Sequence, residues 1–238
     1  MSAAGIGIRL ESVSRHYAGE GGVVRAVDGV SLEVEPGASL AIMGPSGCGK
    51  STLLALIAGL ETPTAGRVAV GEHEVSALDD AARTRLRREL LGLVFQADNL
   101  LPFLSAAQNV SLQVALAGAD CYHRCNEILA RLGLDDQGEK LPDQLSGGQR
   151  QRVAVARALV GRPRAVLADE PTGSLDSESS AAVIDLLLAA QRDLGVTMVV
   201  VTHDHQVAAR LERTVLLRDG RLVDERRDRR SERAFADA

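Results

Sequence analysis

The sequence predicts an α/β fold with a largely parallel sheet, a β-rich N-terminal part and a helical insertion. Short apolar strands alternate with helices in residues 38–95 and again in residues 165–217. Such alternation is typical of a parallel sheet that is covered on both faces. The first forty residues look rich in strands, and strand patterns disappear between residues 97 and 160. The length of 238 residues fits one large domain of this kind or two small ones.

The first half of the chain is expected to form strands on both sides of a glycine-rich loop. Two strands of roughly alternating hydropathy are separated by the turn at residues 19–22, and Pro36 and Gly37 mark the next turn. A short apolar strand leads into the loop at residues 44–49, and a helix follows it. The expected strands cover residues 5–14, 26–34, 38–43, 67–70 and 91–95, and the expected helices cover residues 51–58 and 79–90.

The second half is expected to begin with the insertion and then to return to alternating strands and helices. From Glu225 on, arginine alternates with acidic residues without apolar periodicity, which predicts a solvated tail. The expected helices lie near residues 106–117, 122–132, 148–160 and 177–194, and the expected strands cover residues 165–168, 196–201 and 214–217.

Composition excludes several classes of protein. With 45% apolar and 25% charged residues, the chain can bury a core, which excludes a disordered chain or a fibre. Two tyrosines, three phenylalanines and a net charge of −5 argue against a nucleic-acid partner, which needs stacking surfaces or a basic footprint. Three cysteines and no secretory signal favour a reducing cytoplasm. No apolar run reaches the length of a membrane span.

Residues 44–51 match the phosphate-binding motif G-x-x-x-x-G-K-[ST]. Glycines let successive backbone N–H groups turn toward phosphate oxygens, and the following helix adds its positive end. Lys50 is expected to reach the β- and γ-phosphates, Ser51 to bind Mg²⁺, and Thr52 to contact the α-phosphate. The alternative is an ordinary glycine-rich turn before a helix. The residues expected to bind ATP here are Gly44, Pro45, Ser46, Gly47, Cys48, Gly49, Lys50, Ser51 and Thr52.

Two acidic residues follow the apolar strand at residues 165–168. Unpaired carboxylates at the end of a buried strand are costly unless they serve a purpose. Asp169 is expected to hold Mg²⁺, and Glu170 to act as the general base that polarises the attacking water. Taken alone, the pattern fits equally well a strand followed by an acidic helix cap.

The segment Leu145-Ser-Gly-Gly-Gln149 narrows the interpretation. With this signature between the two motifs above, the chain closely resembles the ATP-binding subunits of ABC transporters, from about residue 6 to about residue 225. The resemblance implies a RecA-like P-loop NTPase core with an N-terminal antiparallel β-subdomain and an inserted α-helical subdomain. Within one domain of residues 1–238, it places the core at about 1–95 and 160–225, the helical subdomain at about 96–159, and a charged tail at about 226–238.

The resemblance also implies roles for residues outside the phosphate loop. Gln96 matches the residue that senses Mg²⁺ and the γ-phosphate, His203 matches the histidine that contacts the γ-phosphate, and Tyr17 matches the aromatic ring that stacks on adenine. Asp176 belongs to a loop that crosses a dimer interface. In the family, two subunits enclose two ATP molecules, and the signature acts on the opposite subunit's ATP. The signature residues expected to do so are Ser146, Gly147, Gly148 and Gln149.

The implied catalytic set is therefore Lys50, Gln96, Glu170 and His203, with Mg²⁺ held by Ser51, Gln96 and Asp169. The two cysteines Cys121 and Cys125 are spaced as on one helix face, but they lack enough further ligands for a convincing zinc site.

A family member without a spanning helix needs a separate membrane permease, and the resemblance places the chain peripherally at the cytoplasmic face of the plasma membrane. Residues 59–66, 98–102 and 167–173 look like the lipoprotein-release, macrolide-export and cell-division subset. Residues 97–105 correspond to the region that receives the permease's coupling helix. The alternatives are the ATPase of an importer, for instance of amino acids, and an ABC protein that does not transport.

Overall fold

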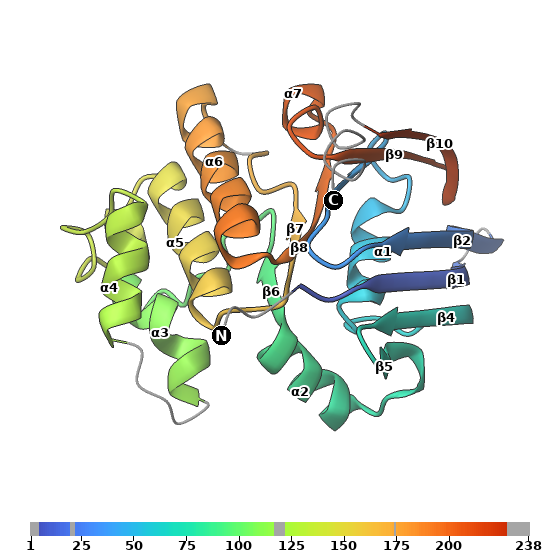
Figure 1. Cartoon of the computed structure of the whole chain (residues 1–238), viewed down its shortest axis with the longest axis horizontal. Helices are drawn as coiled ribbons and strands as arrows, with labels where there is room; N and C mark the ends of the chain where they lie inside the picture. Colours follow the sequence, from blue (N-terminus) through green and yellow to red (C-terminus); the bar gives the residue numbers. More distant parts are fainter. Residues whose placement is uncertain (1–4, 20–21, 117–121, 174, 228–238) are drawn as a thin grey trace, which may run out of the picture.

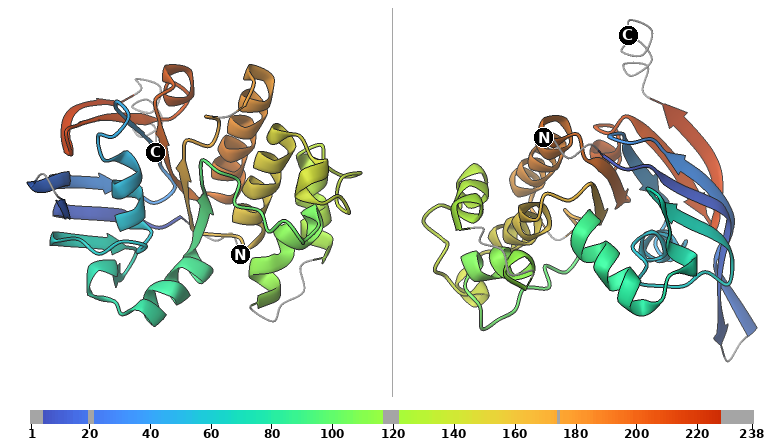
Figure 2. Two further views of the ribbon diagram at one scale, coloured as in Figure 1. Left: turned by 180° about the vertical axis from the view of Figure 1, so that it is seen from behind. Right: turned by 60° about the horizontal axis from the view of Figure 1, so that its bottom comes forward.

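The computed structural model describes residues 5–19, 22–116, 122–173 and 175–227. It contains a four-stranded and a six-stranded sheet with helices between and beside them (Figure 1). The helices of the insertion and the four-stranded sheet lie at opposite ends of the molecule (Figure 2).

The four-stranded sheet is antiparallel and has the order β2-β1-β4-β5. Its two long strands extend beyond the expected ranges, and two residues separate them. Irregular register in β1 between Leu10 and His16 interrupts the hydropathy alternation there, because a bulge shifts side chains from one face to the other. The strands are β1 (Ile8–Gly19), β2 (Gly22–Val34), β4 (Ala65–Val70) and β5 (His73–Glu74).

The six-stranded sheet has the order β10-β9-β3-β8-β7-β6, with β10 antiparallel to β9 and the other pairs parallel. This arrangement confirms the predicted α/β class with a largely parallel sheet. The strands are β3 (Ser39–Met43), β6 (Leu91–Val94), β7 (Ala165–Asp169), β8 (Thr197–Thr202), β9 (Arg213–Arg218) and β10 (Arg221–Arg227).

Alternate side chains of the central strands enter two different cores. In β3, Leu40 and Ile42 join the core that contains α1 (Lys50–Ile57) and the antiparallel sheet. Ala41 and Met43 join the core that contains α5 (Gly147–Val160) and α6 (Ser177–Leu194). Because both faces are buried, these strands read as continuous apolar runs.

The insertion contains α3 (Ala106–Leu116), α4 (Tyr122–Arg131), a 3₁₀ turn at Pro142–Gln144 and then α5. A third core holds these helices together, with Val110, Leu129 and Val153 among its buried residues. The remaining helices are α2 (Asp80–Leu90), the 3₁₀ turn Val75–Ala77 and α7 (His205–Ala208).

One expectation about the C-terminal part is wrong. The chain does not leave the fold at Glu225 but continues as β10 to Arg227. Glu225 pairs with Val215 in register, and its carboxylate accepts a 2.8 Å bond from Arg213 Nε. A solvent-exposed edge strand carries charged residues, so its sequence resembles that of a solvated chain end. Of the expected tail, residues 228–238 lie outside the described residues.

Candidate functional site

The phosphate loop connects β3 to α1 and packs directly against β2. Gly49 has φ of 104° at the start of α1, which only glycine adopts readily. A Cβ atom on Gly49 would lie 1.9 Å from the carbonyl oxygen of Ala26, so no other residue fits here. The sequence motif therefore reflects close backbone contact as well as backbone freedom.

Lys50 lies at the first position of α1 and turns back over the loop. Its Nζ donates to the carbonyl oxygens of Gly44 at 2.8 Å and Pro45 at 3.0 Å, and the residue is only 7% exposed. The ammonium group is thus held beside the phosphate loop. When ATP binds, it can replace these carbonyl acceptors with phosphate oxygens.

Asp169 ends β7 beside α1, and the Ser51 hydroxyl donates to its Oδ1 at 3.1 Å. Burial raises the pKa of Asp169, the negative charge of Glu170 adds to this, and the Ser51 bond and Lys50 oppose it. A hydroxyl and a half-buried carboxylate side by side are the oxygen donors that Mg²⁺ prefers. The pair therefore fits a divalent cation, whose charge would compensate the buried carboxylate.

Glu170 and His203 follow the adjacent parallel strands β7 and β8, so their side chains meet at one edge of the sheet. Glu170 Oε1 lies 2.9 Å from His203 Nδ1; the glutamate side chain is 12% exposed and the histidine side chain 70%. Glu170 has φ of 45°, an uncommon left-handed conformation for a residue with a side chain. Backbone strain of this kind is concentrated at functional sites.

Lys50, Ser51, Glu170 and His203 line one cavity of about 460 Å³, and Asp169 adjoins it through its hydrogen bond with Ser51. The cavity unites the phosphate loop with Gln96 after β6, Glu170 after β7 and His203 after β8. Its lining residues are Ala26, Ser46, Gly47, Gly49, Lys50, Ser51, Thr52, Gln96, Glu170 and His203. Ala26 was not expected, because a small residue in a predicted strand carries no chemical signal; only its contact with Gly49 brings it there.

Tyr17, Asp176 and the signature residues do not line this cavity. The Tyr17 ring instead packs under the Arg15 guanidinium, 4.6 Å from its centroid, which is a cation–π contact. Arg15 also pairs with Glu61 at 2.7 Å. In this structure Tyr17 thus has a packing role within the antiparallel sheet.

The signature begins α5 as a capping box. Ser146 Oγ accepts from Gln149 N at 3.2 Å, and Gln149 Oε1 accepts from Ser146 N at 2.8 Å. A Cβ on Gly148 would lie 2.6 Å from Ser179 Oγ, so the first turns of α5 and α6 are in close contact. Ser179 in turn donates from N at 2.9 Å and from Oγ at 2.8 Å to Asp176, which caps α6.

The chain on both sides of Gln96 is bound to α5 by three side chains. Gln151 Nε2 donates to Phe95 O at 3.1 Å, Arg150 Nε to Asp98 Oδ2 at 2.8 Å, and Arg157 to the carbonyl oxygens of Asp98 and Asn99 at 2.8 Å each. Burial lowers the pKa of Arg157, and the Asp98 charge opposes this. The cavity residue Gln96 and the signature helix are thus joined through one loop.

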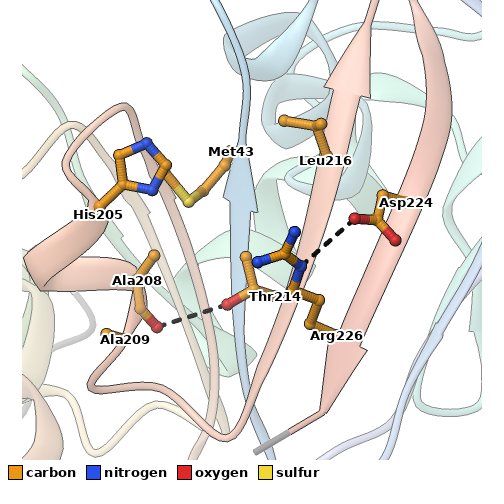
Figure 3. A pocket seen from close by; sticks show the side chains of 8 residues that line it. All are labelled: Met43, His205, Ala208, Ala209, Thr214, Leu216, Asp224 and Arg226. Carbon is orange, nitrogen blue, oxygen red and sulfur yellow. Dashed lines mark hydrogen bonds and ion pairs between the residues drawn. The ribbon is translucent and has the colours of Figure 1, made fainter.

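A second cavity of about 280 Å³ lies between α7 and strands β9 and β10 (Figure 3). Met43, which directly precedes the phosphate loop, points into it together with His205 and Leu216. Arg226 Nε and Asp224 Oδ2 pair at 3.4 Å on its β10 side.

Cys125 is buried in the core of the insertion. Cys121, with which it shared an expected helix face, lies outside the described residues. Within the part of the chain that the structure describes, no helix has the length and apolar character needed to cross a membrane.

Comparison with known proteins identifies the family. The family described as ABC transporter matches residues 27–173. The chain therefore belongs to the ABC transporter family, and it is an ATP-binding, ATP-hydrolysing cassette with the P-loop NTPase fold.

Its relatives include export-related ATPases. It is 45% identical over 219 residues to the lipoprotein-releasing system ATP-binding protein LolD of Xanthomonas axonopodis pv. citri, covering 90% of this chain and 89% of LolD. It is 46% identical over 221 residues to the macrolide export ATP-binding/permease protein MacB of Hyphomonas neptunium. That alignment covers 92% of this chain but only 34% of MacB, so the chain spans about a third of that relative's length.

Solved structures agree with this assignment. The dimeric, post-hydrolysis structure of the ATP-binding cassette MJ0796, bound to ADP and Pi, matches with a TM-score of 0.88 and 40% identity. The match covers 92% of this chain and 98% of that one. The chain is thus an ABC transporter ATPase of the LolD and MacB type.

Proposed function

We propose that this ATPase powers export, or transmits force across a membrane, through a separate permease. The observation that supports this proposal most directly is that four separate segments of the chain line one cavity. They contribute the side chains of Lys50, Ser51, Gln96, Glu170 and His203. The similarity to LolD and MacB supports the export-related role.

Within the cavity, each side chain has a role that its position supports. Lys50 and the loop N–H groups bind the phosphates, and Thr52 contacts the α-phosphate. Ser51, Gln96 and Asp169 hold Mg²⁺, which compensates phosphate charge when it is bound. Glu170 accepts the proton of the attacking water, while the 2.9 Å contact with His203 Nδ1 keeps its carboxylate oriented.

The signature and Asp176 act between two copies of the chain. Ser146, Gly147, Gly148 and Gln149 form a helix start outside the cavity, and a helix start of this kind favours an anion. Two chains in head-to-tail contact would present it to each other's γ-phosphate. The dimeric state of the cassette MJ0796 supports this assembly.

The permease binds at the loop 97–105 and the helices that follow, and the chain works at the cytoplasmic face of the plasma membrane. Phe103 in this loop is 72% exposed, so its ring is accessible to a partner. Because Asp98 and Asn99 are bonded to α5, closure around ATP would move this loop together with the signature helix.

The variant Glu170→Gln tests the assignment of the base. It keeps the shape of the side chain but removes the proton acceptor, so ATP hydrolysis should fall by about a hundredfold or more while ATP binding persists. Steady-state phosphate release measures hydrolysis, and calorimetric titration measures ATP binding. In the presence of the permease, size-exclusion chromatography with ATP should show that the variant is trapped as a dimer.

Glu72→Gln is the matched control, because Glu72 is exposed and outside the cavity. It should hydrolyse ATP at the wild-type rate. Hydrolysis by Glu170→Gln at the rate of the control would contradict the role of Glu170.

A further inference from the structure

The hairpin turn between β9 and β10 reaches back to the nucleotide cavity. Arg218 and Arg221 are paired in register, which leaves Asp219 and Gly220 as a two-residue turn. Their φ angles are 49° and 76°, and positive φ at both central residues is the requirement of a type I′ turn.

The Gly220 residue joins the phosphate loop to β2 through both of its backbone polar groups. Its N–H donates to the carbonyl oxygen of Cys48 at 3.0 Å, and its carbonyl accepts from the N–H of Asp28 at 2.9 Å. Cys48 directly precedes Gly49, which lines the cavity. The turn therefore holds the phosphate loop at Cys48, next to the residues of the loop that line the cavity.

The contact is closely packed, because no side chain separates the three backbones. A Cβ on Gly220 would lie 2.9 Å from Arg25 O and 3.0 Å from Ala26 O. The same Ala26 carbonyl is the group that excludes a Cβ on Gly49. The strand β2 is thus in contact with the turn and with the phosphate loop at once, and displacing one of them displaces the others.

An ion pair fixes the turn on β2. Arg221 donates to Asp28 Oδ2 from Nη2 at 2.7 Å and from Nε at 3.1 Å. Arg25 Nη1 lies 3.6 Å from the same oxygen, and His16 Nε2 lies 3.6 Å from Oδ1. The Arg221 hydrogen bond is the largest of the effects that lower the pKa of Asp28, and Arg25 contributes to a smaller extent. The carboxylate is therefore charged at neutral pH and binds the residue next to the turn.

We propose that Gly220 and the Asp28–Arg221 pair are positioning residues for ATP binding, which they control by holding Cys48 and Gly49 in place. The inference rests on the proposed role of the phosphate loop, whose N–H groups bind phosphate only when they are correctly aimed. A misplacement of about 1 Å at such a site has a large effect. None of the three residues lines the cavity.

The variant Gly220→Ala tests this proposal against Gly195→Ala. Both glycines have left-handed φ, 76° and 64°, so alanine introduces similar backbone strain at each. Gly195 has open space where its Cβ would lie, whereas a Cβ on Gly220 collides with β2. The difference between the variants therefore isolates the contact with β2.

Calorimetric titration of the full chain with Mg-ATP gives the dissociation constant. Gly220→Ala should raise it by about tenfold, and Gly195→Ala should stay within about twofold of the wild type. Amide hydrogen exchange of residues 46–50 without nucleotide should be faster in Gly220→Ala alone. Equal dissociation constants and equal exchange in the two variants would overturn the proposal, even if both variants melt at lower temperature.

A second pair of variants decides the matter if Gly220→Ala does not fold. Arg221→Ala removes the ion pair without a backbone collision and should raise the dissociation constant by about threefold, while Arg221→Lys keeps the charge and should restore most of the affinity. Wild-type affinity in Arg221→Ala would overturn the proposal. If the wild type does not bind ATP, the assignment of residues 44–51 as a phosphate-binding loop is wrong. The positioning role of Gly220 and the Asp28–Arg221 pair is then wrong as well.

Discussion

Lys50 illustrates how a single residue is prepared for its ligand. Its ammonium group is bound by two carbonyl dipoles of the loop. Hydrogen bonds to a charged phosphate oxygen are stronger than those to a neutral carbonyl. The exchange of one for the other therefore favours binding, and it needs only a small movement because the ammonium group is already at the loop.

Replacement of Lys50 should weaken ATP binding without unfolding the chain. We expect Lys50→Ala to bind ATP at least about tenfold more weakly, which corresponds to about 1.4 kcal/mol, and to lose hydrolysis. Lys140 is the second of the chain's two lysines and is exposed near the end of the insertion, so Lys140→Ala is a matched control. Equal affinity of the two variants in calorimetric titration would contradict the role of Lys50.

At this scale, the sequence predicted the polar residues of the cavity better than the apolar ones. Gln96, Glu170 and His203 line one cavity because each follows a strand of the parallel sheet, and such strand ends share one edge; their roles toward ATP stay predictions. Ala26 was missed, whereas Tyr17 packs under Arg15 and its stacking on adenine stays a prediction. The position of Ala26 depends on its contact with Gly49, which lies in a distant segment, and no local pattern records such a contact.

Among the elements, α6 shows how a helix start connects two functional segments. Asp176 caps it by accepting from Ser179 N, and this bond lowers the pKa of the carboxyl group, with the Ser179 hydroxyl adding to the effect. Ser179 also touches Gly148 of the signature. The cap therefore defines the position of the segment that contacts the signature helix.

The lowered pKa of Asp176 predicts a pH dependence of stability. The ionised carboxylate stabilises the folded chain above the ordinary pKa of aspartate, and this contribution is lost as the pH falls through the lowered value. Asp176→Ala should lower Tm at pH 7 by about 3 °C, whereas Asp176→Asn should keep the cap and lose less stability than the wild type between about pH 5 and pH 2, the range in which the carboxylate takes up its proton. Thermal melts at pH 7 and across this range measure both effects, and identical pH profiles for the wild type and Asp176→Asn would contradict the assignment.

Elements with strong local signals were predicted well. The bounds of α6 agree with the expected residues 177–194, because an acidic cap precedes it and a glycine in the left-handed conformation follows it. The tail predicted from Glu225 on includes the last three residues of β10, and the short elements β5 and α7 were not expected. The residues of β5 and β10 are mostly polar and exposed, and pairing with β4 and β9 makes them regular, whereas α7 is only four residues long.

On the scale of the whole molecule, the β-rich part and the helical insertion lie on opposite sides of the nucleotide-binding core (Figure 1). The loop after β6 carries Gln96 at one end and the exposed Phe103 near the other. A partner that binds Phe103 would therefore be connected to the cavity residue Gln96 by the six residues between them, two of which, Asp98 and Asn99, are bonded to α5.

Phe103→Ser should separate permease binding from catalysis. Exposed side chains contribute little to stability, so Tm and basal ATP hydrolysis should stay close to the wild-type values. Co-purification of the permease from detergent-solubilised membranes should be lost. Leu60→Ser, at another exposed apolar residue outside the insertion, should retain the permease. Retention by Phe103→Ser would place the docking surface elsewhere.

The capping box of α5 has a consequence for the assembled dimer. In the cap, Ser146 Oγ serves as an acceptor for Gln149 N. A hydroxyl group has two lone pairs and one proton, and this bond occupies a lone pair only. The helix start can thus fix the oxygen atom while the proton remains available for a phosphate of a second chain. The same atom can keep its own helix intact and bind across the interface, so dimer formation need not unwind the end of α5.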